Sequence, residues 1–170
     1  MGISALALLL AGFALAHAAW SVSDLPAGDL LTPLAMTTPG EQTPPTLIRY
    51  VGATQDEAIA KGRAEMDSLR AKGQPWAFVR EGLLPEGGTK QDVLLVELWG
   101  PGMDAPLSLV QRFRPAAARG GFQLLGAPLV AVGGVVQPDS AVATVLEAVM
   151  EGVRRHKQAA AQWEAWHGRP

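Results

Sequence analysis

Residues 2–20 read GISALALLLAGFALAHAAW, a run without a charged side chain. An α-helix rises about 1.5 Å per residue, so this run spans roughly 28 Å, close to the thickness of a bilayer's hydrocarbon core. Its apolarity comes from five leucines and Phe13 set among many alanines, which gives only a moderate membrane-insertion signal. Three interpretations therefore remain open: a membrane anchor, a cleaved export signal, or a buried core helix.

The flanks of the run predict where the rest of the chain lies. Asp24 and Asp29 follow the run, and no Lys or Arg occurs before Arg49. Because basic residues are retained on the cytoplasmic side, this distribution predicts an inside amino terminus and an extracytoplasmic body. We therefore expect the chain to contact a membrane through residues 2–20.

Two residues distinguish retention from cleavage. Trp20 ends the run, at the position where an indole prefers the headgroup region of a retained anchor. Ala16-His17-Ala18 fits the small-x-small pattern of signal peptidase, although no basic segment precedes the run. The sequence thus favours an anchor over residues 1–20, with secretion after cleavage near Ala18 as the alternative.

Composition narrows the classes of function. The 170 residues are 48% apolar, enough for one core, and the net charge of -2 predicts no nucleic-acid partner. The chain has no cysteine. This excludes a disulfide framework, a thiolate metal site, a cysteine nucleophile and a cysteine-linked lipid.

Residues 21–46 separate the run from the body. They contain five prolines and two glycines, without helical or strand periodicity. Proline restricts its own φ and biases the preceding residue towards extended conformations. The composition predicts a semi-rigid Pro-rich linker that tethers the body.

The predicted globular domain covers residues 47–170. It opens with a short strand over residues 47–51, and Thr54 and Glu57 then match a capping box that begins a helix over about 55–72. Strand patterns follow at 76–84, 92–99, 106–114 and 122–132, the last as a strand pair or one strand bent near Gly126 and Pro128. A long carboxy-terminal helix starts after Pro138, with a possible bend at Gly152.

This order predicts an α+β fold: an antiparallel sheet of four to five strands covered by two helices, preceded by the apolar helix and the Pro-rich tether. Over about residues 47–155 the order resembles the PsbP/DcrB-like group of extracytoplasmic domains. The resemblance implies an accessory or assembly role without catalysis. It carries no residue roles to this chain.

The sequence predicts no catalytic, cofactor-binding or metal site and no enzymatic activity. It lacks the nucleophile-elbow, zinc-protease and phosphate-loop motifs. Glu164 and His167 have the spacing of a helical metal motif, but one copy near a chain end indicates a solvent-facing pair. Glu97, on an apolar strand, is interpreted as ion-paired or edge-facing.

The candidate interaction residues are aromatic or basic: Trp20, Arg154, Arg155, Lys157, Trp163 and Trp166. The cations form a cluster suited to anionic headgroups or an acidic partner, or simply a solvated helix surface. The last two tryptophans share a helical face, as an interface anchor or as packing on the sheet.

The leading functional prediction is a membrane-tethered extracytoplasmic accessory or structural subunit of a bacterial envelope assembly, acting through a protein partner. The alternative is an envelope module that binds a small apolar ligand in a cavity lined by Trp76, Phe78, Trp99 and Phe113. No cofactor is expected for either.

Overall fold

The computed structural model describes residues 2–40 and 42–168; Met1, Glu41, Arg169 and Pro170 lie outside the described residues. The fold is α+β, as predicted, and its described part contains four helices and one open antiparallel sheet. The helices are α1 (Ala5–Val22), α2 (Gln55–Ala71), α3 (Asp139–Arg154) and α4 (Lys157–Trp166). The strands are β1 (Leu34–Thr37), β2 (Thr46–Arg49), β3 (Trp76–Glu86), β4 (Thr89–Trp99), β5 (Leu107–Arg114), β6 (Gln123–Val132) and β7 (Val135–Val136), in the spatial order β2-β1-β3-β4-β5-β6-β7.

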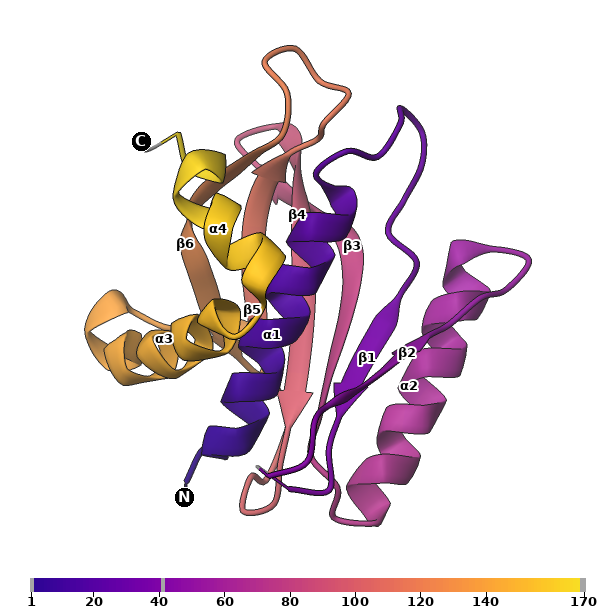
Figure 1. The fold of residues 1–170 in the computed structure, drawn as a ribbon, viewed down its shortest axis with the longest axis vertical. Helices are drawn as coiled ribbons and strands as arrows, with labels where there is room; N and C mark the ends of the chain where they lie inside the picture. Colours follow the sequence, from indigo (N-terminus) through magenta and orange to yellow (C-terminus); the bar gives the residue numbers. More distant parts are fainter. Residues whose placement is uncertain (1, 41, 169–170) are drawn as a thin grey trace.

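Helix α1 lies in the core. It crosses in front of the sheet, and α3 and α4 lie beside it (Figure 1). Eleven of its 18 residues are buried, and Ala7, Ala11, Ala14 and Ala18 have no exposed surface. A helix that is apolar on all sides needs cover, and the sheet and the two carboxy-terminal helices cover most of α1, whereas Leu6, Phe13 and His17 stay partly exposed.

Helices α1 and α3 touch through their backbones. A Cβ added to Gly12 would lie 1.9 Å from the carbonyl oxygen of Val149, and one added to Gly152 would lie 2.3 Å from that of Leu9. Only glycine permits such an approach, because any side chain at the crossing forces the helix axes apart. Gly152 therefore marks the crossing point rather than a bend.

Helix α2 covers the other face of the sheet. Neighbouring strand residues point to opposite faces. Phe78 points to α2, since its ring lies 2.3 Å from a Cβ added to Gly62. Glu81, on the opposite face of the same strand, lines a cavity with Val22 at the end of α1. The sheet is thus sandwiched between α2 and the layer formed by α1, α3 and α4.

The predicted start and end of α2 are confirmed. Thr54 Oγ1 accepts a hydrogen bond from the Glu57 N–H at 3.1 Å, and Glu57 Oε2 accepts one from the Ala53 N–H at 2.7 Å. These side chains satisfy backbone donors that have no partner within the helix. Gly73, with φ of 70°, follows the last turn and ends the helix.

Several expectations for the fold differ from the structure. The described sheet has seven strands instead of four to five, because β1 lies within the predicted linker 21–46 and β7 adds a two-residue edge. The predicted long carboxy-terminal helix is two helices, α3 and α4, separated at Arg155 and His156. Residues 123–132 form the single strand β6, whose register against β5 shifts between Val110 and Arg112, which confirms the second alternative.

Helix α1 satisfies the length and composition criteria for a membrane span, and in the described residues it alone does so. In this structure 61% of it is buried. An apolar helix near the amino terminus is therefore confirmed, and its packing is that of a core helix. Its assignment as anchor or signal stays a prediction.

We predict that Gly12→Ala lowers the free energy of unfolding by more than about 2 kcal/mol, because the new methyl group meets the α3 backbone. Alanine is the better helix former by about 1 kcal/mol, so propensity acts in the opposite direction. Urea denaturation measures the difference. Gly40→Ala is the control, since a Cβ there has no neighbour within 4 Å; an equal effect of both substitutions would refute the crossing argument.

Candidate functional site

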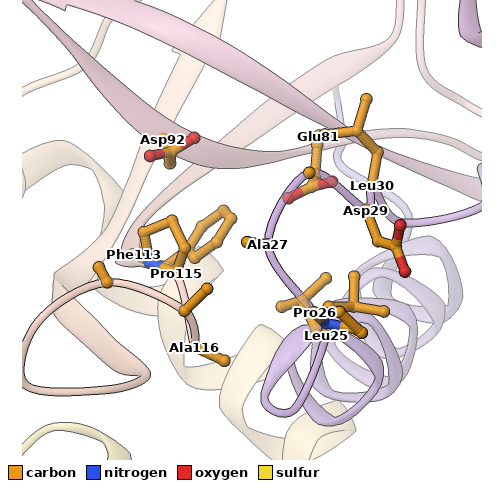
Figure 2. A pocket seen from close by; sticks show the side chains of 14 residues that line it. Leu25, Pro26, Ala27, Asp29, Leu30, Glu81, Asp92, Phe113, Pro115 and Ala116 are labelled. Atoms are coloured by element: carbon orange, nitrogen blue, oxygen red, sulfur yellow. The ribbon is translucent and has the colours of Figure 1, made fainter.

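A hollow of about 370 Å³, the large cavity, lies where α1 ends. Figure 2 shows its walls, which come from the loop after α1, from strands β3, β4 and β5, and from the loop after β5. The lining residues are Val22, Leu25, Pro26, Ala27, Gly28, Asp29, Leu30, Glu81, Asp92, Phe113, Pro115, Ala116, Ala117 and Ala118. The cavity is mainly apolar, with carboxylates as its charged groups.

The loop after α1 forms one wall of the cavity, and a hydrogen-bonded turn fixes its shape. Helix α1 ends at Val22, and a turn follows in which the Asp29 N–H donates to the Pro26 carbonyl oxygen at 3.1 Å. Gly28 has φ of 84°, a conformation that residues with side chains rarely adopt. This turn presents Ala27 towards Phe113, across the cavity (Figure 2).

Glu81 connects this loop to the sheet. Its Oε2 accepts a hydrogen bond of 2.6 Å from the Leu31 N–H. Burial raises the pKa of the Glu81 carboxyl, the Leu31 hydrogen bond partly opposes this, and the charge of Asp92 adds to the rise. Glu81 and Asp92 are thus close enough to repel each other when both are ionised.

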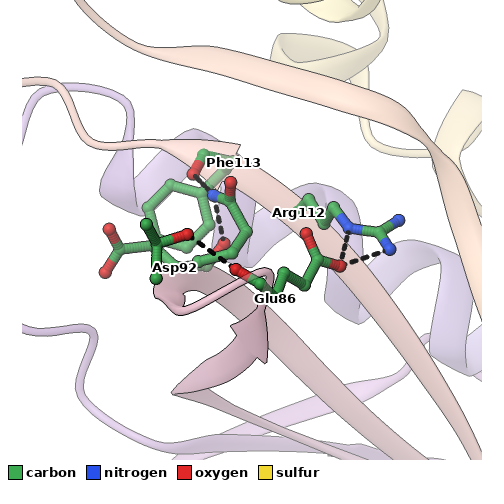
Figure 3. Close-up of polar contacts among 6 residues, drawn as sticks. Glu86, Asp92, Arg112 and Phe113 are labelled. Atoms are coloured by element: carbon green, nitrogen blue, oxygen red, sulfur yellow. Dashed lines mark hydrogen bonds and ion pairs between the residues drawn. The ribbon is translucent and has the colours of Figure 1, made fainter.

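None of the ion pairs among the described residues includes the Asp92 carboxylate. Arg112 Nε donates to Glu86 Oε1 at 2.6 Å, and Figure 3 shows the Asp92 carboxylate directed away from this pair. The Gln91 amide is also occupied, by the carbonyl oxygens of Asp92 and Phe113 at 3.1 and 2.8 Å. The neighbouring polar groups therefore leave the Asp92 carboxylate to the cavity.

The chemistry of the cavity does not match a metal centre. Within residues 2–40 and 42–168 no group of three or more His, Asp or Glu residues could hold a metal ion. The cavity offers an apolar surface with localised negative charge, which suits recognition of an organic molecule.

A second cavity of about 280 Å³ lies between the bend of β6 and helices α3 and α4. Glu164 and His167 both line it, so this pair does not simply face solvent. The ring nitrogens of His167 lie 2.8 Å from the Trp163 carbonyl oxygen and 3.2 Å from that of Gly126. His167 thereby ties the last helix to the bent strand.

The predicted interaction residues separate into two groups. Trp20 is 42% exposed, and its ring centroid lies 5.9 Å from that of His156. In the sequence, His156 lies between the basic residues Arg155 and Lys157. Arg154 and Arg155 are exposed and pair with Glu151 of the same helix. The structure thus places Trp20 beside His156 at the α3–α4 junction.

The other two tryptophans lie elsewhere. Trp163 is only 5% exposed and belongs to the core. Trp166 is partly buried and meets Phe122 edge to face, with ring centroids 5.4 Å apart. Their packing role was the alternative to an interface anchor, and the described contacts match packing.

The aromatic residues proposed to line a ligand cavity do not act together. Phe113 lines the large cavity, whereas Trp76, Phe78 and Trp99 lie on the α2 side of the sheet. Glu97 lies on that side too and pairs with Arg63 at 3.3 Å, which confirms the ion-pair interpretation.

A histidine pair that the sequence did not predict joins α1 to the α3–α4 junction. His17 Nδ1 lies 3.0 Å from His156 Nε2, and the Ala159 N–H donates to His156 Nδ1 at 3.1 Å. Since His156 Nδ1 accepts, the neutral His156 ring carries its proton on Nε2 and donates to His17. His17 then carries its proton on Nε2, 3.3 Å from the Arg49 guanidinium, where two donors face each other.

This arrangement disfavours protonation of either histidine ring. Burial, the neighbouring His156 and the Arg49 charge lower the pKa of His17 from 6.5 to about 4. Burial also lowers the pKa of His156. The signal in the sequence was weak, because the two histidines are 139 positions apart.

Comparisons with known proteins add no relative: no protein family, curated protein or solved structure matches the chain. The resemblance to the PsbP/DcrB-like group therefore stays a prediction, and the site rests on its own geometry.

We predict that acid destabilises the protein through His17. The pKa of His17 is lower in the folded state than in the unfolded state, so the neutral ring stabilises the folded state. This stabilisation is fully present above about pH 6.5 and is lost as the pH falls towards about 4. Allowing for solvent screening, we expect about 1 kcal/mol of loss between pH 7 and pH 5 from this group. Urea denaturation of the wild type and His17→Leu at both pH values measures it; equal losses in the two proteins would contradict the prediction.

Proposed function

We propose that the protein is a non-catalytic binding module whose cavity at the end of α1 holds a small, largely apolar molecule. The observation that supports this is the cavity's size of about 370 Å³ with mainly apolar walls. Ligand cavities commonly measure roughly 300–1,000 Å³ and combine apolar walls with a few polar groups. Here Glu81 and Asp92 are such groups.

The loop after α1 is the natural entry to this cavity. Ala27, Gly28, Asp29 and Leu30 are exposed on their outer side, yet all four contribute to the cavity wall. The Glu81–Leu31 hydrogen bond holds the base of this loop against β3. A ligand that displaces the loop tip would therefore reach Phe113 without disturbing the sheet.

A second candidate function is a membrane-associated accessory or assembly subunit on the extracytoplasmic side of an envelope. It is supported by Trp20, which is exposed beside His156, and by the exposed cations Arg155 and Lys157, which flank His156 in the sequence. Indole rings and basic side chains both suit the headgroup region of an anionic membrane. Association through this surface would leave α1 in the core.

The burial of α1 restricts how the second function could operate. Cleavage near Ala18 would remove most of a helix that covers the sheet and contacts α3 at Gly12. A secreted form lacking α1 would expose the apolar residues beneath it. We therefore favour a full-length chain in either function.

We predict that the neutral dye N-phenyl-1-naphthylamine binds in the large cavity and gains fluorescence. Ala27→Trp should reduce this binding at least about tenfold, because the indole would fill the space opposite Phe113. Ala127→Trp is the matched control, since it fills the second cavity instead. Equal dye binding by all three proteins, or reduction only by the control, would argue against the proposed site.

We predict that the body is extracytoplasmic, so a lone cysteine on it reacts with a membrane-impermeant maleimide while the cytoplasmic membrane is sealed. Lys90→Cys suits the test because residue 90 is exposed, whereas the neighbouring Gly87 has φ of 55°, which strains other residues. A cytoplasmic protein with an accessible thiol serves as control. Labelling only after lysis would place the body in the cytoplasm.

A further inference from the structure

The charged side chains that line the large cavity are all acidic. Among the described residues, its lining includes Asp29, Glu81 and Asp92 and no Lys, Arg or His. Asp29 lies on the exposed loop, whereas Glu81 and Asp92 lie on adjacent strands, deeper in the wall. Two carboxylates thus share an apolar hollow that contains no basic side chain.

The protein satisfies these carboxylates only in part. Glu81 Oε2 has the Leu31 N–H as partner, a neutral donor. Arg112 on β5 pairs with Glu86 on the opposite face, and the exposed Lys90, two residues from Asp92 on β4, does not line the cavity. Ionised carboxylates in an apolar site favour a nearby cation, because desolvation and mutual repulsion both penalise their charge.

We propose that the cavity selects ligands that join an apolar body to an organic cation, such as an alkylammonium group. This inference rests on the proposed function of the same cavity and adds the chemical class of its ligand. The cation would lie between Glu81 and Asp92, and the apolar part would lie against Phe113 and Pro115, which adjoin Asp92 in Figure 2. An organic cation fits better than a metal ion, since the described carboxylates form no metal-binding group.

Three probes with the same alkyl chain test this selection: octyltrimethylammonium, 1-octanol and octanoate. Isothermal titration calorimetry at pH 7.5, below the micelle concentration, gives their affinities for the full-length protein. We expect octyltrimethylammonium to bind at least about tenfold more tightly than 1-octanol, and octanoate to bind most weakly, because the cavity attracts a cation and repels an anion.

Substitution of the carboxylates should remove the preference but keep the cavity. Glu81→Gln retains an oxygen acceptor for the Leu31 N–H, and Asp92→Asn preserves size. The double variant should bind octyltrimethylammonium and 1-octanol within about threefold of each other. Glu97→Gln is the matched control, since this carboxylate lies on the α2 side and pairs with Arg63; it should keep the wild-type preference. If the double variant fails to fold, Asp92→Asn alone should lower the preference.

The outcomes separate the two proposals. Equal affinities of the wild type for the three probes, or tighter binding of octanoate, would overturn the cation selectivity and leave the apolar cavity as a ligand site. A preference that survives the double variant would also overturn it. Absence of binding by every probe would overturn the proposed binding function itself.

Discussion

The close contact between α1 and α3 sets the arrangement of the rest of the molecule. Gly12 and Gly152 bring the two backbones so near that an added Cβ would collide with a carbonyl oxygen of the other helix. This contact holds α3 against α1, and α4, which follows α3, also packs on α1. The position of α4 in turn places His156 against His17. The two glycines thereby set how closely the helices of this layer pack over the sheet.

Local sequence patterns predicted the parts of the fold that depend on local physics. The capping residues Thr54 and Glu57, the helix end at Gly73 and the bend of β6 at Gly126 each follow from backbone geometry within a few residues. Strand β1 was missed because its four residues are all buried, and a strand this short without alternation shows no period. Prolines around it then favoured a linker.

The packing of α1 and the candidate site could not be predicted from the sequence, because both depend on contacts between segments that are distant in the chain. Length and apolarity do not distinguish a core helix from a membrane span, because both bury every face. A finer signal was present: Ala7, Ala11, Ala14 and Ala18 recur at helical spacing along one face, and all are fully buried. The cavity brings together three segments around Val22, Glu81 and Phe113, which no short-range pattern could connect.

The cavity's location follows from a mismatch in length between helix and strands. Eighteen residues of α1 extend about 27 Å, whereas the 11 residues of β3 or β4 extend roughly 36 Å. The sheet therefore continues beyond Val22, and the remaining surface is covered only by a turn and by the loop after β5. Turns pack less completely than helices, so a hollow remains at this end. The carboxylates of Glu81 and Asp92 lie on the uncovered part of the strands, where an added ligand would complete the layer that the helix leaves unfinished.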